Sequence, residues 1–460
     1  MIVQNIKLLH LVGLSRDERR AIFISSLSGL IEFYDFIIFG LMGIYFSKII
    51  FANSNTSNWG VFILFSIFIL GYTARPIGMK LYSKVAVNYS STVVNLWVIS
   101  LLFISSIAIG MTPTYKEIGI LSPIFLMLAR LVQGISSGAE RQGEYDHLAI
   151  KLSGNNHFAI LGFLAGNELG QVLGIFVYRG ITFSLSTQQL ESFGWRIPFF
   201  IGSVLIIITF FLRLKFGEPI SEKHYQRSVL PSYKLIRRFP QHTSIAIAIS
   251  GLKGCTTFLY LVFIPFSLLY YLHYSYLTIS HIIFQTTILS LISVFIINYF
   301  ITFDNALKLL FTGVILTVPA LGFWAWSFMH NRLIYSSVFV IATLANLFSL
   351  STPRVIAGLF PPSFRLQGVT FCHQSGFILF AGITPLFNIG LAHILYRIFP
   401  TVKHSNIFFI GTVCYISIIM LINLFCLRNI HKYASYQELH QLSQTIKQKL
   451  MSRKKTSRKK

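Results

Sequence analysis

Two carboxylates lie three residues apart inside a long apolar run near the start of the chain. They are Glu32 and Asp35, in a run that covers about residues 21–46. Three residues are close to one helical turn, so both side chains are expected on one helix face. The run is long enough to span a bilayer, where a carboxylate is costly unless it is paired, protonated or in a wet cavity. The pair therefore indicates a site for a proton or a solute.

Other charged residues lie at a similar depth in other apolar runs. At about 1.5 Å per residue, Glu32 and Asp35 lie roughly 16 and 21 Å from the start of their helix, and Arg130 lies about 18 Å from the start of its own. Glu168 and Lys253 each lie about ten residues into their runs. Buried charges of opposite sign compensate one another, and these three acids and two bases are suited to do so.

Two interpretations of these charged residues are open. In the first, they line a central cavity where a proton and a solute share charged groups, and Tyr34 and Gln133 line it too. In the second, some are structural ion pairs between helices, and Glu168 and Lys253 simply neutralise each other. The first interpretation has a physical basis for coupling, because moving a cation toward or away from a carboxylate changes its affinity for a proton.

The composition is that of a membrane protein. Of 460 residues, 54% are hydrophobic and 11% are charged, whereas about a quarter of a soluble domain is charged. Apolar runs with turn-rich breaks predict an all-α protein with about twelve transmembrane helices in two six-helix halves. The expected spans are 21–46, 59–82, 92–112, 118–141, 158–181 and 195–214, then 243–271, 277–301, 306–328, 334–356, 367–395 and 405–427.

These spans divide the chain into five segments. We expect a cytoplasmic N-terminus (1–20), a six-helix bundle (21–214), a cytoplasmic central loop (215–242), a second six-helix bundle (243–427) and a basic cytoplasmic tail (428–460). With both termini in the cytoplasm, most Lys and Arg residues fall on the cytoplasmic side, as the positive-inside rule requires. Topology therefore explains the net charge of +24, and no nucleic-acid partner is expected.

The basic tail has two open interpretations. Apolar residues recur at helical spacing between Tyr436 and Leu450, ahead of a final stretch rich in Lys and Arg. The tail is either a solvated basic segment or a contact for anionic lipids. Beyond the bilayer, protons and a small-molecule solute, no partner is expected, and the protein is expected to be a monomer.

The sequence carries no motif of an enzyme. It has no H-E-x-x-H, G-x-S-x-G or P-loop pattern, so we expect neither catalysis nor a cofactor or metal. Glu144, Asp146 and His147 are interpreted as a polar helix end. The four cysteines have no paired spacing and are expected to be reduced.

Five segments carry motifs in a fixed order. They read G-L-I-E-F-Y-D-F at 29–36, R-P-I-G at 75–78, R-L-V-Q-G-I-S-S-G-A-E at 130–140, G-W-R-I-P-F at 194–199, and F-P-P-S-F-R-L-Q-G with G-I-T-P at 360–368 and 382–385. In this order they resemble the metabolite:proton symporter family of the major facilitator superfamily, which includes proline/betaine, α-ketoglutarate, citrate and shikimate transporters. The resemblance covers about residues 20 to 425.

The resemblance implies a function and roles for six residues. It implies a proton-coupled transporter of the bacterial inner membrane for a small polar solute, either an osmolyte such as proline or betaine or a carboxylate. Asp35 and Glu32 would carry the proton, with Arg130 coupling it. Arg75, Glu140 and Arg196 would support the gates.

The superfamily's loop motif after the second helix has eroded. The superfamily's usual Asp in this loop is Val87 here, and its G-R-R is S-S-T at 90–92. The alternative is therefore a transport-inactive membrane sensor or scaffold with a transporter-like sequence.

Overall fold

The computed structural model describes residues 16–51, 57–85, 88–89, 91–151, 156–216, 232–301, 303–361, 364–399, 401–428 and 430. Within these ranges the regular structure is helical throughout, which confirms the predicted all-α fold class. Residues 217–231 of the expected central loop and the apolar pattern of the tail lie outside them, as does Val87. The limits of the five expected segments stay predictions.

Each expected span of the first half corresponds to helix. The elements are α2 (Arg16–Ile49), α3 (Ser57–Thr73) with α4 (Arg75–Val85), α5 (Ser91–Gly110), α7 (Leu121–Lys151), α8 (Asn156–Ser184) and α10 (Ile197–Phe216). The second span is thus two helices, because Pro76 supplies no backbone N–H to continue α3. Three short elements that the sequence did not predict lie between the spans: α6 (Tyr115–Ile118), α9 (Thr187–Ser192) and η2 (Gly194–Arg196).

The second half begins with the short helix α12 (Ser232–Arg238), and two of its spans are interrupted. The first runs through α13 (Pro240–Phe258), the π-helical turn η3 (Leu259–Phe263) and α14 (Ile264–Tyr270). Next come α15 (Tyr276–Phe300), α16 (Phe303–His330) and α17 (Ile334–Leu359). The interrupted fifth span is α18 (Arg365–Gly376), the π-helical turn η5 (Phe377–Gly382) and α19 (Thr384–Ile398), and α20 (His404–Arg428) follows. Such turns inside long helices are frequent at functional sites.

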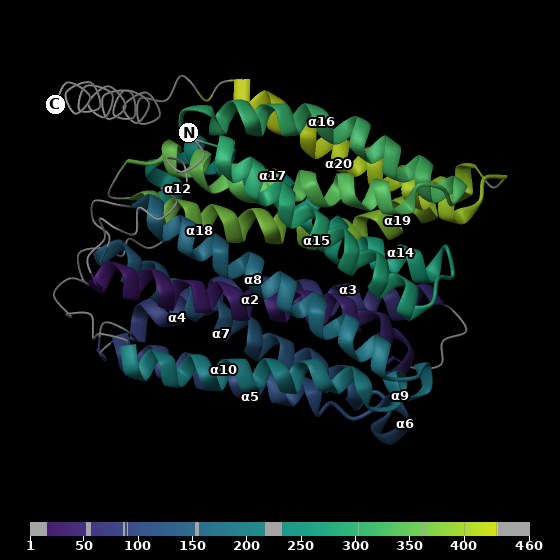
Figure 1. Ribbon diagram of the computed structural model, residues 1–460, viewed down its shortest axis with the longest axis horizontal. Coiled ribbons are helices and arrows are strands. Elements are labelled where there is room, and N and C mark those ends of the chain that lie inside the picture. The colour runs from purple at the N-terminus through teal and green to yellow at the C-terminus, as the bar shows by residue number, and fades with distance from the viewer. Residues whose placement is uncertain are drawn as a thin grey trace, which may run out of the picture.

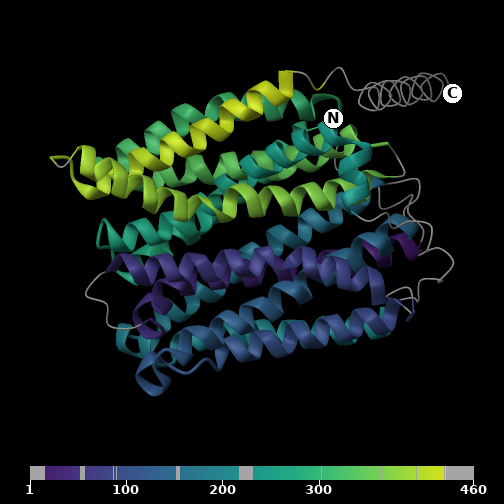
Figure 2. The same ribbon diagram turned by 180° about the vertical axis from the view of Figure 1, so that it is seen from behind.

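The helices form two layers that correspond to the two halves. Figure 1 shows α2 to α10, in purple and blue, on one side and the green and yellow helices of the second half on the other, and Figure 2 shows the same division from behind. Nine stretches of the described residues are long and apolar enough to cross a membrane. We call the end of the bundle where α2 begins the start end, and the opposite end the far end; α20 finishes at the start end (Figure 1).

Close helix packing in the first half depends on two glycines of α7. A Cβ atom on Gly134 would lie 2.0 Å from the carbonyl oxygen of Gly71, and one on Gly138 would lie 2.1 Å from that of Arg75. Real Cβ atoms do not approach so closely, so α7 can lie against α3 and α4 only without side chains here. This contact brings Arg130 and Gln133 of α7 next to α2 and α3.

Replacement of Gly138 by Ala is expected to lower the thermal unfolding temperature of the purified protein. The added methyl group must displace the backbone of α4, and overpacking of this kind costs about 1–3 kcal/mol. Gly322→Ala in α16 is the matched control, because no atom lies within 4 Å of its Cβ position. Unfolding followed by intrinsic fluorescence in detergent compares the two, and an equal unfolding temperature for Gly138→Ala and the unsubstituted protein would contradict this packing.

Candidate functional site

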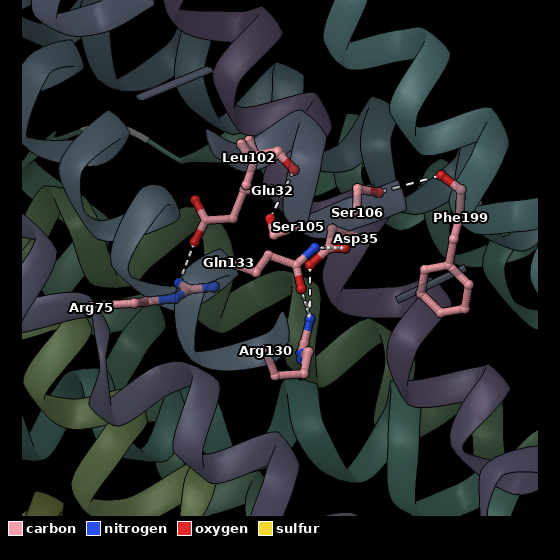
Figure 3. Close-up of polar contacts among 9 residues, drawn as sticks. All are labelled: Glu32, Asp35, Arg75, Leu102, Ser105, Ser106, Arg130, Gln133 and Phe199. Carbon is pink, nitrogen blue, oxygen red and sulfur yellow. Dashed lines mark hydrogen bonds and ion pairs between the residues drawn. The ribbon is translucent and has the colours of Figure 1, made fainter. Parts of the chain in front are cut away.

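Asp35, Arg130 and Gln133 form a closed hydrogen-bonded triangle. Arg130 Nη1 donates to Asp35 Oδ2 at 3.1 Å and to Gln133 Oε1 at 2.5 Å, and Gln133 Nε2 donates to Asp35 Oδ1 at 2.6 Å (Figure 3). Arg130 and Gln133 are three residues apart on α7, so one helix face presents both. Both oxygens of the Asp35 carboxylate are therefore held, and this triangle joins α2 to α7.

The two charged members of the triangle differ in exposure. The Arg130 side chain is 5% exposed, and its guanidinium carbon lies 3.6 Å from the ring centre of Phe39. The Asp35 side chain is 20% exposed. It also lines a cavity of about 10 Å³ between α2, α5, α7 and α10, enough for about one water molecule. The cation is fixed in place, whereas the acid remains accessible to a proton.

Tyr34 anchors the same part of α2. Its hydroxyl donates to the carbonyl oxygen of Pro198 at 2.7 Å, and its ring lines the cavity beside Asp35. Ser106 of α5 donates to the carbonyl oxygen of Phe199 at 3.3 Å on the opposite wall (Figure 3). Tyr34 therefore ties α2 to α10 and borders the site.

Glu32 pairs with a different arginine from Asp35. Arg75 Nη1, at the start of α4, lies 2.5 Å from Glu32 Oε1 and donates to Gln374 Oε1 of α18 at 3.2 Å. The Arg75 guanidinium also lies 4.0 Å from the ring centre of Tyr72. Figure 3 shows the two acids directed at their separate partners. Arg75 is thus a link between the two halves at this level.

The other two residues expected at the gates have different surroundings. Glu140 Oε1 pairs with Arg213 Nη2 at 2.8 Å, and Arg213 also contacts the hydroxyl of Ser28. Arg196 donates to the carbonyl oxygens of Ser192 and Thr112 at 3.0 Å each. These contacts lie within the first half, so they join its helices to each other; a gating role for Glu140 and Arg196 stays a prediction.

Glu168 and Lys253 face each other across the two halves. Glu168 on α8 interacts electrostatically with Lys253 on α13. Lys253 Nζ also lies 3.1 Å from Nε2 of His373 on α18. The structure therefore brings Glu168 and Lys253 together in a second cluster, which also contains His373.

Four partners in these networks were not found from the sequence. They are Arg213, His373, Gln374 and Tyr72. Arg213 lies next to the basic central loop, where cations are expected for topological reasons, so the sequence did not suggest a buried partner for it. His373, Gln374 and Tyr72 are neutral, so comparing the depths of charged residues along the helices could not identify them.

The chain is similar in sequence to known transporters of small solutes. No profile of a known protein family matches the chain. The proline/betaine transporter of Escherichia coli K12 is 26% identical over 390 residues, which are 80% of this chain and 76% of the relative. The α-ketoglutarate permease of the same organism is 31% identical over 217 residues, which are 45% of this chain and 49% of the relative.

Solved structures share the fold at low sequence identity. The D-xylose-proton symporter superposes with a TM-score of 0.65 at 14% identity, over 88% of this chain and 96% of that one. The POT family transporter PepTSo superposes with a TM-score of 0.66 at 9% identity, over 90% and 98% of the two chains. The relatives and the shared fold together show a solute transporter, not an enzyme, with the fold of major facilitator superfamily transporters and a sequence similar to proline/betaine transporters and α-ketoglutarate permease.

Proposed function

We propose that Asp35 is the proton carrier of a symporter that takes up a small polar organic solute by alternating access. The observation that carries the proposal is the triangle of Asp35, Arg130 and Gln133, in which a buried arginine holds a partly exposed carboxylate. Protonation of Asp35 removes the charge that attracts Arg130. The arginine then loses its ionic partner, so the position of α7 relative to α2 depends on the proton.

Contacts between the two halves, at the far end and nearer the start end, support alternating access. At the far end, the rings of Tyr45 and Tyr276 are 4.5 Å apart, and Tyr276 donates to Glu191 at 3.1 Å. Nearer the start end, Arg75 donates to Gln374. Opening one end and then the other would break these two sets of contacts in turn. Opening the start end would break the Arg75–Gln374 bond and so change the surroundings of Glu32, the ion-pair partner of Arg75.

The relatives and the distribution of charge support a proposal for the solute and for the membrane location. The relatives are named for proline/betaine and for α-ketoglutarate, so an osmolyte or a carboxylate is proposed as the solute. The Lys and Arg distribution supports a bacterial inner-membrane location with the start end in the cytoplasm. The protein is proposed to act as a monomer, with the basic tail free in solvent or on anionic lipids.

A transport-inactive sensor or scaffold is the second candidate. The substitution of the superfamily's loop Asp by Val87 favours it. The ion pairs Glu32–Arg75 and Asp35–Arg130 oppose it, because costly intramembrane charges are expected to disappear once transport is lost.

Asp35→Asn is expected to abolish proton-driven accumulation while leaving exchange of solute across the membrane. Asparagine preserves the shape and some hydrogen bonds of the triangle but cannot take up a proton. Proteoliposomes are tested with labelled proline, betaine, α-ketoglutarate and citrate, with and without a pH gradient. The expected loss of accumulation is at least tenfold.

The control for this variant is Glu117→Gln, which removes an exposed carboxylate from the short helix α6 at the far end. It is expected to accumulate solute normally. Full accumulation by Asp35→Asn at the same protein level would show that Asp35 is not the carrier. Absence of uptake and exchange of every probe by the unsubstituted protein would favour the sensor or scaffold.

Gln374→Leu is expected to populate arrangements that are open at the start end. It removes the acceptor on α18 for Arg75 and leaves the Glu32–Arg75 ion pair in place. Spin labels at exposed positions 84 on α4 and 308 on α16 report the separation of the halves. The distance distribution should gain a longer component, and an unchanged distribution would mean that this bond does not hold the halves together.

A further inference from the structure

Lys253 is a buried cation on the second half's side of the interface. Its side chain is 1% exposed, and Nζ lies 3.1 Å from His373 Nε2. The ring of Phe377, in the π-helical turn η5, stacks on His373 with centres 4.6 Å apart. When the ammonium donates to Nε2, the histidine is neutral and carries its proton on Nδ1. The Nδ1–H then points away from the ammonium, so His373 positions Lys253, and the ammonium is the donor that a ligand at this point would meet.

The second half supplies no carboxylate at this level. Between residues 243 and 427 the sequence has one acidic residue, Asp304, and it is the second residue of α16 at the start end. The expected membrane spans of the same segment contain three cations, Lys253, Lys308 and Arg354. The acid that faces Lys253 is Glu168, which belongs to the first half.

Glu168 is held less completely than Glu32, Asp35 and Glu140. Its Oε2 atom is buried and accepts no hydrogen bond from the described residues. By contrast, Glu32, Asp35 and Glu140 each contact an arginine of the first half at 2.5 to 3.1 Å. Those three pairs can stay intact when the halves move apart.

Separation of the halves therefore has a specific electrostatic consequence. Glu168 moves away with α8, and Lys253 remains in the wall of the second half, where no carboxylate of that half can replace it. A cation exposed to a cavity within the bilayer is strongly stabilised by an anion. A solute that enters at this point can supply one.

We propose that the solute is an organic anion and that its carboxylate binds Lys253 in the place that Glu168 takes when the halves are together. Lys253 would supply the charge, and His373 would hold the ammonium in position by accepting one of its hydrogen bonds. The inference rests on the proposed transport function, since it assigns a solute class and a binding site to that cycle. Glu168 then competes with the solute for the same cation.

Equilibrium binding to the purified protein in detergent tests this site without a proton gradient. The probes are 2-oxoglutarate, citrate and lactate as anions, and proline and betaine as zwitterions. Thermal stabilisation is measured over a range of concentrations, since a ligand that binds the folded state raises its unfolding temperature. At least one anion is expected to stabilise the protein more strongly than either zwitterion.

Single variants should change the affinity for that anion in opposite directions. Lys253→Met is expected to weaken it at least tenfold, and Lys253→Arg to retain part of it. Glu168→Gln is expected to strengthen it, because the competing carboxylate is gone. Gly322→Ala, far from any close contact, should leave it unchanged.

The double variant Lys253→Met/Glu168→Gln separates a binding site from a structural ion pair. It leaves no uncompensated charge, so it is expected to fold even where Lys253→Met does not. If the two residues only neutralise each other, the double variant binds the anion normally; a binding site predicts that it does not.

The proposal is overturned if no anion stabilises the protein, if a zwitterion does so more strongly, or if the double variant binds the anion as the unsubstituted protein does. These results are independent of proton-driven accumulation. A failure of Asp35 as the carrier can therefore be told apart from a failure of this site.

Discussion

The cost of holding a carboxylate inside a bilayer is the constraint on which this structure depends. Three of the acids are each compensated by an arginine from a different helix. Glu32 pairs with Arg75 of α4, Asp35 with Arg130 of α7, and Glu140 with Arg213 of α10. Breaking a buried pair typically costs about 3–5 kcal/mol. These pairs therefore fix how α2, α4, α7 and α10 are arranged, and the glycines of α7 allow the close approach that they need.

The two halves differ in how they balance charge. The first half pairs Glu32, Asp35 and Glu140 internally. The second half is cationic, and its Lys253 meets an acid of the first half, Glu168, across the interface. A rigid movement of the halves leaves the internal pairs intact and changes the environment of Glu168, Lys253 and Arg75. Proton binding within the first half and solute binding between the halves can then be coupled through α2, which carries both Glu32 and Asp35.

The pairing of Asp35 with Arg130 could be anticipated from the sequence, since both lie at similar depth in apolar helices. The partner of Glu32 was not found, because Arg75 lies seven residues from the nearer end of its expected span, 59–82, whereas Glu32 lies eleven residues into its own, so the two do not match in depth. The sequence indicated that Lys253 and Glu168 compensate each other. It did not indicate His373, because a neutral side chain inside a membrane helix needs no partner of opposite charge.

The helical spans themselves follow from hydropathy, and their interruptions do not. The π-helical turns η3 and η5 lie within apolar runs and are followed by Pro265 and Pro385, as the break between α3 and α4 is followed by Pro76. Proline alone does not predict an interruption, because Pro319 and Pro353 lie inside the continuous helices α16 and α17.

Proton movement that accompanies solute entry tests the central claim most directly. Proteoliposomes in weakly buffered medium, with no initial pH gradient, are given an inward gradient of the solute that binds, and the external pH is recorded. The account predicts that the medium becomes more alkaline as the solute enters, because each transport cycle carries a proton inward on Asp35. Entry of labelled solute with no change of external pH would contradict it.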